Sequence, residues 1–147
     1  MIGYYLVEHA DRWEIPLTGK SVSRFIIDRR VILDFLDPED EETTIEIEAD
    51  FKVKVDSGEY MLSPEKRTDL GPIFELFNYT VQSAVAFKNG TLELKFVENA
   101  TLTVSPTPEL ESWQVIGARG LRVVCTGGGQ IFTWQADHSG LTGGDLH

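Results

Sequence analysis

The stretch Asn89-Gly90-Thr91-Leu92-Glu93-Leu94-Lys95-Phe96 places a two-residue turn signal directly before a strand. Asn-Gly is the strongest short signal of a β-hairpin, because both residues accept positive φ. The next five residues alternate apolar and polar side chains, which is typical of a half-buried strand. Similar short segments recur along the chain. Strands are therefore predicted for residues 31–35, 44–48, 51–55, 92–96, 101–104, 121–125 and 130–134.

One short helix is predicted between these strands. Leu70, Ile73, Phe74 and Phe77 follow the spacing i, i+3, i+4 and i+7, which places them on one face of an α-helix. Asn78, a residue type that tolerates positive φ, is expected to end the helix.

The chain repeats a pattern. Leu17-Thr18-Gly19-Lys20-Ser21-Val22 resembles Leu76-Phe77-Asn78-Tyr79-Thr80-Val81, and similar strands follow each stretch. We therefore expect pseudo-repeats over about 17–48 and 76–105, with chance similarity between hairpins as the alternative. The predicted fold is mostly β (α+β): two pseudo-repeated antiparallel meanders with one short helix between them. A sandwich and a partly open barrel both remain open. Residues 1–135 would form a single domain, followed by a flexible tail over 136–147.

The composition is that of an acidic globular protein. The 147 residues carry a formal net charge of −11, which disfavours nucleic acid and anionic membranes and favours a basic protein partner. No segment is apolar enough to span a membrane, and the first residues do not have the pattern of a signal peptide. The single cysteine, Cys125, excludes an intramolecular disulfide and fits a cytoplasmic location.

Four further marks are similar to a family of small bacterial proteins of unknown function. They are an L-x-G-x-x-V opening from Leu17, an N-G-T-L-x-L-x-F hairpin from Asn89, an E-x-W at Glu111, and G-L-R-V-V-C from Gly120 followed by G-G and a tryptophan. The resemblance covers about four fifths of the chain and implies no activity. Because proteins of this sort often accompany toxin genes, it implies an immunity role. The run from Asp37 to Glu42 is longer and more acidic than the family's usual turn.

No catalytic or metal-binding set is recognisable in the sequence. His138 and His147 fall in the predicted tail, and His9 is expected at the surface. Cys125 sits among valines and is interpreted as a buried structural thiol. Residues 127–129, three glycines, are not followed by the Lys-Ser/Thr of a phosphate loop and are interpreted as a hairpin turn. We expect no cofactor, no metal and no enzymatic activity, although catalysis by paired carboxylates stays the least favoured alternative.

The predicted function is that of a non-enzymatic binding protein, most concretely an immunity-type inhibitor of a toxin or effector. The alternative is a small-molecule-binding or accessory domain that uses a barrel mouth or a sheet cleft. The run Asp37–Glu42 should be an exposed loop that serves solubility or steers a basic partner. Aromatic residues near the start of the chain, together with Trp113 and Trp134, either anchor the sheets or contribute to a binding patch. The candidate partner-binding residues are Glu39, Asp40, Glu41, Glu42, Tyr4, Tyr5 and Trp13.

Overall fold

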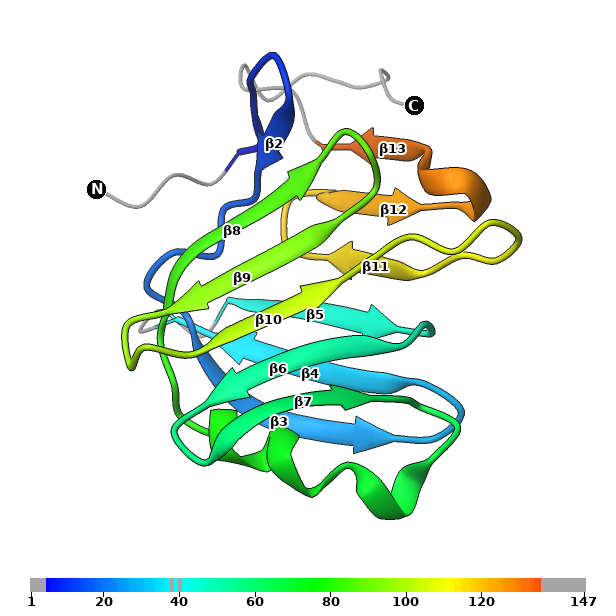
Figure 1. Cartoon of the computed structure of the whole chain (residues 1–147). Helices are drawn as coiled ribbons and strands as arrows, with labels where there is room; N and C mark the ends of the chain where they lie inside the picture. Colours follow the sequence, from blue (N-terminus) through cyan, green and yellow to red (C-terminus); the bar gives the residue numbers. More distant parts are fainter. Residues whose placement is uncertain (1–4, 38, 40, 136–147) are drawn as a thin grey trace.

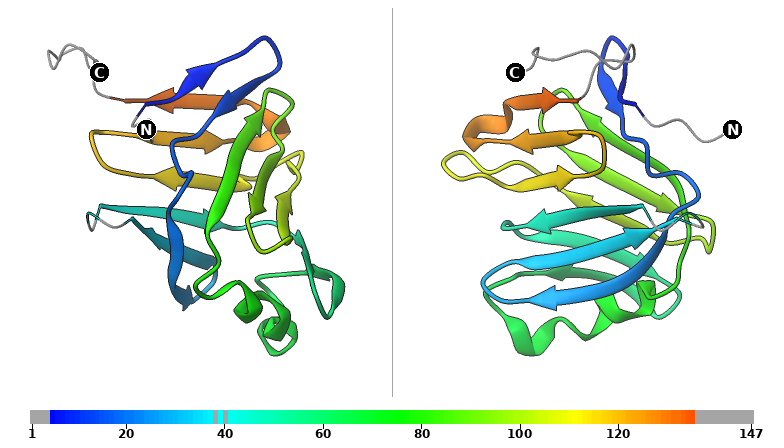
Figure 2. Two further views of the ribbon diagram at one scale, coloured as in Figure 1. Left: turned by 90° about the vertical axis from the view of Figure 1, so that its left-hand side faces the viewer. Right: turned by 180° about the vertical axis from the view of Figure 1, so that it is seen from behind.

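Two antiparallel sheets form the structure, a computed structural model that describes residues 5–37, 39 and 41–135. The seven-stranded sheet has the order β1-β2-β8-β9-β10-β6-β7, and the six-stranded sheet has the order β13-β12-β11-β5-β4-β3. The sheets stack as separate layers (Figures 1 and 2). The predicted mostly β fold is thus confirmed, and within the described residues it is a sandwich with no closed barrel.

The seven-stranded sheet contains β1 (Val7–Glu8), β2 (Arg12–Glu14), β6 (Phe51–Val55), β7 (Gly58–Leu62), β8 (Val81–Phe87), β9 (Leu92–Phe96) and β10 (Thr101–Val104). The six-stranded sheet contains β3 (Ser21–Ile27), β4 (Val31–Leu36), β5 (Glu42–Ile47), β11 (Trp113–Ile116), β12 (Arg122–Cys125) and β13 (Ile131–Trp134). All seven predicted strands are present. No strand range was predicted for β1, β2, β3, β7, β8 or β11. β1 and β2 are very short, and the bulges in β3 and β8 interrupt the alternation that marks a strand.

The two predicted meanders are β3-β4-β5 and β8-β9-β10, and they share two local features. Each begins after a residue with positive φ, Gly19 at 89° and Asn78 at 66°. Each first strand carries a bulge at the same place, after Val22 in β3 and after Val81 in β8. Whether this correspondence arose by duplication stays a prediction.

Reciprocal main-chain hydrogen bonds join the starts of the two meanders. Gly19 N donates to Val81 O over 2.9 Å, and Asn78 N donates to Val22 O over 2.9 Å. Between these two bonds, the Ser21 and Thr80 hydroxyls lie 3.0 Å apart. The pairing explains why the L-x-G/N-x-x-V pattern occurs twice, since each copy closes against the other.

The chain changes sheets once after each meander. After β5 it crosses through residues 48–50 to β6, which pairs with β10 of the other meander. After β10 it crosses through residues 105–112 to β11, which pairs with β5. Each sheet is therefore built from both halves of the chain.

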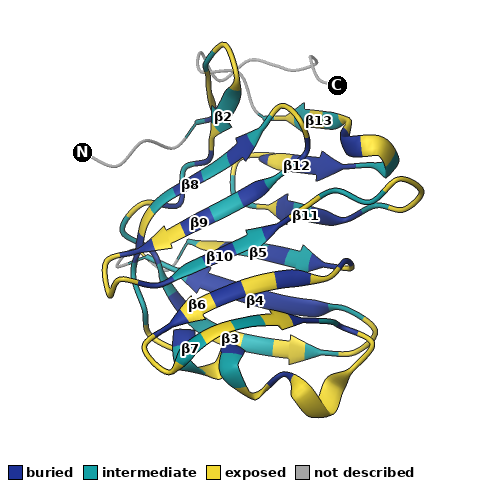
Figure 3. Cartoon of the chain, in the orientation of Figure 1, coloured by how far each residue is buried: buried dark blue, intermediate teal, exposed yellow. Residues whose placement is uncertain are grey.

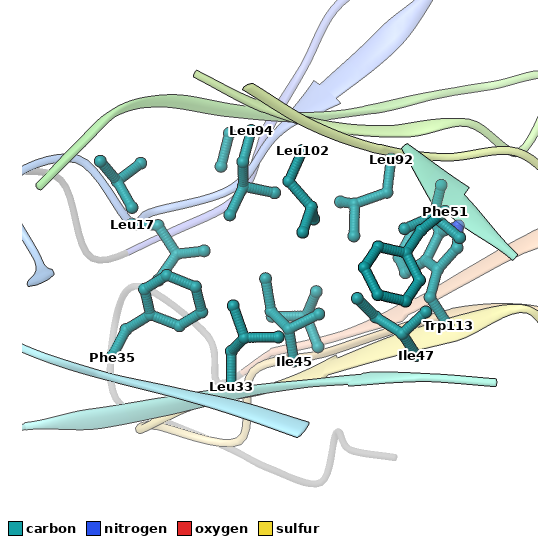
Figure 4. Close-up of a cluster of buried hydrophobic side chains, with 14 of the residues drawn as sticks. Leu17, Leu33, Phe35, Ile45, Ile47, Phe51, Leu92, Leu94, Leu102 and Trp113 are labelled. Carbon is teal, nitrogen blue, oxygen red and sulfur yellow. The ribbon is translucent and has the colours of Figure 1, made fainter. Parts of the chain in front are cut away.

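The core lies between the sheets and consists of the inward-facing residues of alternating strands. Leu92, Leu94 and Leu102 point down from one sheet onto Leu33 and Ile45 of the other (Figure 4). Figure 3 shows the resulting alternation of buried and exposed positions along the strands. Burying a leucine or isoleucine side chain contributes about 1.5–3 kcal/mol before entropy costs, so this filled interior is the main source of stability.

A short helical segment does lie between the meanders, but it is 3₁₀ rather than the expected α-helix. It consists of η1 (Arg67–Asp69) and η2 (Gly71–Leu76). Gly71 and Pro72 open η2, and glycine and proline are the residues least favourable to a continuing α-helix.

The 3₁₀ geometry changes which side chains face the core. With three residues per turn, Leu70, Ile73 and Leu76 share the buried face. Phe74 and Phe77, predicted on that face, are instead 47% and 51% exposed.

The turn at residues 127–129 lets three segments meet, and this generates a stability prediction. Gly129 has φ of 87°, and a Cβ there would lie 2.5 Å from Asn89 O. We expect Gly129→Ala to cost about 2–4 kcal/mol, from left-handed strain and overlap, and to lower the Tm by roughly 6–12 °C. Thermal unfolding followed by circular dichroism measures the shift.

The matched control is Gly71→Ala, because a Cβ at Gly71 would meet no atom within 4 Å. This variant should change the Tm by less than about 2 °C. Equal effects of the two substitutions would contradict the proposed close packing around Gly129.

Candidate functional site: a groove at the sheet crossings

An open groove of about 560 Å³ lies where the two crossings meet. Its walls are the β5–β6 crossing, the start of β6, the end of β7, and the longer β10–β11 crossing. The first crossing has three residues, 48–50, whereas the second has eight, 105–112. The added length supplies Pro106, Thr107 and Leu110 to the groove. The groove thus forms where the two crossings differ in length.

Two exposed apolar side chains face this groove. Met61 is 68% exposed and Leu110 is 66% exposed, the two highest values for large hydrophobic residues in the described part of the chain. Met61 occupies an outward position on β7, opposite Lys52 of β6. Exposed apolar groups that gather in one concave place are typical of interaction sites.

Carboxylates surround the apolar residues. Glu48, Asp50 and Glu65 line the groove, and Lys52 is the only basic residue there. Lys52 already forms an ion pair with Glu59 at 3.2 Å. The groove therefore combines apolar contact area with an excess of negative charge.

Glu48 is an exposed residue of the groove whose pKa is affected by charges outside the groove. Partial burial raises its pKa, and the charges of Glu111, Glu46 and Asp28 raise it further, against the opposing effect of Arg30. The Glu48 main chain is fixed, because its N–H donates to Ser112 O over 2.9 Å. A positive charge brought close to the Glu48 carboxylate would stabilise its ionised form.

The long crossing is held by specific hydrogen bonds. Ser112 Oγ accepts from Thr107 N at 2.9 Å, and Thr107 Oγ1 donates to Leu110 O at 2.9 Å. From the neighbouring turn, Gly128 N donates to Thr107 O at 2.8 Å. In Figure 1 this loop projects beside the β12–β13 turn. The groove wall is therefore supported on both sides.

Within the described residues, part of the predicted acidic loop packs against a buried lysine, which the sequence did not indicate. Lys20 is 5% exposed, and its Nζ donates to Glu41 O at 3.0 Å and lies 3.7 Å from Asp37 Oδ2. Asp37 was expected to be exposed, but its side chain is only 7% exposed because it also accepts from the N–H groups of Glu39 and Glu41. Burial alone would raise the pKa of Asp37, but these donors and Lys20 outweigh it and lower the pKa.

The remaining acids of that loop lie at the surface. Glu39 and Glu42 are exposed, while Asp40 lies outside the described residues. Glu41 forms an ion pair with Arg119 at 2.9 Å, and Glu42 lies 3.9 Å from Arg24. The loop precedes β5 and the groove follows it, so the two acidic regions are at opposite ends of one strand.

The aromatic candidates near the N-terminus lie elsewhere. Trp13 is half-buried on β2 of the other sheet, with Lys88 Nζ 5.7 Å from its ring centre. Tyr5 borders a separate hollow of about 230 Å³, and Tyr4 lies outside the described residues. The structure therefore does not bring Trp13 together with Glu41 and Glu42.

The other tryptophans have different environments. Trp113 is fully buried, and its Nε1 donates to Gly90 O over 2.9 Å, so it anchors the sheets. Trp134 is 43% exposed, with Arg122 lying 5.6 Å above its ring.

The candidate reactive residues lie as follows. Cys125 is buried as predicted, and burial raises the pKa of its thiol. His9 is a partly exposed residue 3.4 Å from Glu14, and the two other histidines lie outside the described residues. Among the described residues, no three His, Cys, Asp or Glu side chains are grouped to hold a metal ion. No described helix has the length and apolar character needed to cross a membrane.

Sequence reasoning missed the groove residues. Met61 lies on a strand that was not predicted, and Leu110 lies in a proline-containing loop without periodicity. The available signal was the Pro106-Thr107-Pro108 stretch, which is too long and too rigid for a simple hairpin turn.

The fold and the groove define the protein as an antiparallel β-sandwich with an elaborated crossing loop. The chain belongs to DUF6188, a family of unknown function whose sequence model matches residues 13–135. This match confirms the predicted resemblance to a family without an assigned activity. No curated protein and no solved structure matches the chain.

The charge crowding at Glu48 generates a second prediction. Because the folded-state pKa of Glu48 is raised, its contribution favours folding below the ordinary Glu pKa and is lost as the pH rises through the folded-state value. Because Glu48 is exposed and water screens its neighbours, we expect Glu48→Gln to raise the Tm at pH 7 only slightly, by about 1 °C or less, and to lose this advantage in acid, where wild-type Glu48 is also neutral.

The control for this prediction is Glu65→Gln, which removes the same charge from another exposed residue of the groove. Thermal scans between acid and neutral pH compare the variants. If Glu65→Gln stabilised as much as Glu48→Gln, net charge rather than local crowding would be the cause.

Proposed function

We propose that this chain is a non-enzymatic, cytoplasmic binding protein, most concretely an immunity-type inhibitor that binds a basic toxin or effector protein. The single observation that carries the proposal is the groove in which Met61 and Leu110 are exposed among carboxylates. The immunity role rests on the frequent association of small proteins of this sort with toxin genes, and the free, buried Cys125 is compatible with a reducing cytoplasm.

The groove fits a partner segment with both apolar and basic side chains. Met61 and Leu110 offer contact area that a partner would remove from water, at about 25 cal/mol per Å². Glu48 and Asp50 offer charge for a lysine or arginine of the same segment. Methionine suits this role because its flexible thioether adapts to different partner shapes.

The openness of the groove favours a protein partner over a metabolite. Hydrophobic side chains from both sheets pack into the space between them (Figure 4), whereas the groove opens at the surface. A drug-sized ligand usually buries most of its surface in a concave site, whereas a groove between loops accommodates a protruding segment.

The acidic loop contributes at longer range. Glu39 and Glu42 are exposed at the far end of β5, and the whole chain carries −11 charges. Such a field accelerates the encounter with a basic partner at low salt. We propose that the loop steers the partner and that the groove makes the specific contacts.

Growth rescue tests this function. The probe is the product of the reading frame beside this chain's gene, expressed in a host with and without the chain. We expect the product to arrest growth, the wild-type chain to restore it, and a Met61→Glu/Leu110→Glu variant to fail. The variant removes the apolar contacts but keeps the acidic character, so it separates hydrophobic docking from charge alone.

The matched control is Val97→Glu, at a residue that is 63% exposed and does not line the groove. It should rescue growth as well as wild type. A neighbouring product that does not inhibit growth would contradict the immunity role. Rescue by the double variant would contradict the role of the groove.

A further inference from the structure

β3 has a free edge in the six-stranded sheet, and this feature is independent of the groove. β4 pairs with β3 on one side. On the other side, residues 78–81 cover only the beginning of the strand, through bonds to Gly19, Lys20 and Val22. The remaining part of that edge runs from Arg24 to Ile27.

Hydrogen-bond alternation shows which groups this edge presents. Asp28 N donates across the hairpin to Arg30 O, so Asp28 faces β4. In an antiparallel pair, the main-chain N–H and C=O groups of alternate residues point toward the partner strand. The N–H and C=O groups of Phe25 and Ile27 therefore point away from β4, toward the free edge. Val22, beyond the bulge, bonds outward to residues 78 and 79, as the same alternation requires. Among the described residues, the outward main-chain groups of Phe25 and Ile27 have no partner.

Apolar side chains flank this open edge. Ile26 is 39% exposed on the outer face of the sheet. Phe74 packs edge-on against Phe25 with ring centres 5.1 Å apart, yet it remains 47% exposed, and the nearby Phe77 is 51% exposed. An exposed strand edge with apolar neighbours is a template for pairing with another chain.

We propose that a second copy of this chain docks on the edge, with the two β3 strands pairing antiparallel across a two-fold axis at Ile26. This register places Phe25 opposite Ile27 of the partner copy and Ile27 opposite Phe25 of the partner copy. Both free residues of each copy then exchange main-chain hydrogen bonds. If the two-fold axis lay one residue away, at Phe25 or at Ile27, the other of these two residues would no longer lie opposite a residue with free main-chain groups.

Charge complementarity supports a second copy as the occupant. In the same register, Arg24 of each copy lies opposite Asp28 of the other, on the outer face beside Ile26. The Arg24 side chain is 61% exposed while it contacts Asp34, and the Asp28 side chain is 48% exposed while it contacts Arg30. Both retain surface for a cross-strand ion pair, which adds to a β-pairing when opposite charges face each other.

The size of the free edge also fits this arrangement. Only the portion after the bulge is uncovered, and the symmetric register uses residues 24–28. The partner's β3–β4 turn would then end beside residues 78–81 and extend toward Phe77. The pairing thus covers the apolar groups that the monomer leaves exposed.

Light scattering and amide exchange test the proposal with the full chain. Wild type should change from 16.5 kDa to twice that mass as its concentration rises from micromolar to millimolar. The amide protons of Phe25 and Ile27 should exchange more slowly over the same range. Ile26→Lys places two like charges opposite each other and should weaken dimerisation about tenfold or more.

Val97→Lys is the matched control, since it adds the same charge at an exposed residue away from β3. It should dimerise as wild type does, and at micromolar concentration, where all three proteins are monomeric, both variants should keep the wild-type Tm. A monomeric mass at millimolar concentration would overturn the proposal. So would a dimer that Ile26→Lys leaves intact, or one that does not slow exchange at Phe25 and Ile27.

Discussion

Each meander is extended by a strand from the other half of the chain, and this pairing ties the whole sandwich together. β5 pairs with β11 from the second half of the chain, and β10 pairs with β6 from the first half. Neither half can therefore complete a sheet or bury its apolar face alone. The hydrogen bonds around Ser21 and Thr80 fix the starts of the meanders, and Trp113 fixes β11 by bonding to Gly90 across the core.

The two crossings between the sheets differ in length, because the paired strands do not restrict how long each connection is. The first crossing needs only residues 48–50 to change sheets, which shows that a short connection is sufficient. The second uses residues 105–112 and secures them with Thr107 and Ser112. The added residues include Leu110, which is exposed in the same groove as Met61. The extra length therefore contributes to the surface of the protein and not to its core. Functional residues commonly lie on loops supported by a rigid scaffold, and this groove follows that arrangement.

The sequence predicted the fold better than the site, for physical reasons. Asn89-Gly90 and the alternation in 92–96 determine local structure, so the hairpin could be predicted from a few residues. The 3₁₀ geometry of η2 could not be predicted in this way, because helical periods of 3.0 and 3.6 residues place side chains similarly over only six residues. It nevertheless decided that Leu76 is buried and Phe74 exposed. The environment of Asp37 depends on Lys20, a contact between distant residues that no local pattern contains.

We propose that the groove takes up a basic and apolar segment, and the Met61 methyl group can report this binding directly. The chain has two methionines, Met1 and Met61, so methyl-labelled protein gives two resolvable NMR signals. The probe is a synthetic peptide of alternating lysine and leucine, with a glutamate–leucine peptide as control. The account predicts that only the lysine peptide shifts the Met61 signal, that Met1 stays unchanged, and that salt weakens the effect. An unchanged Met61 signal, or an equal response to the glutamate peptide, would contradict the account.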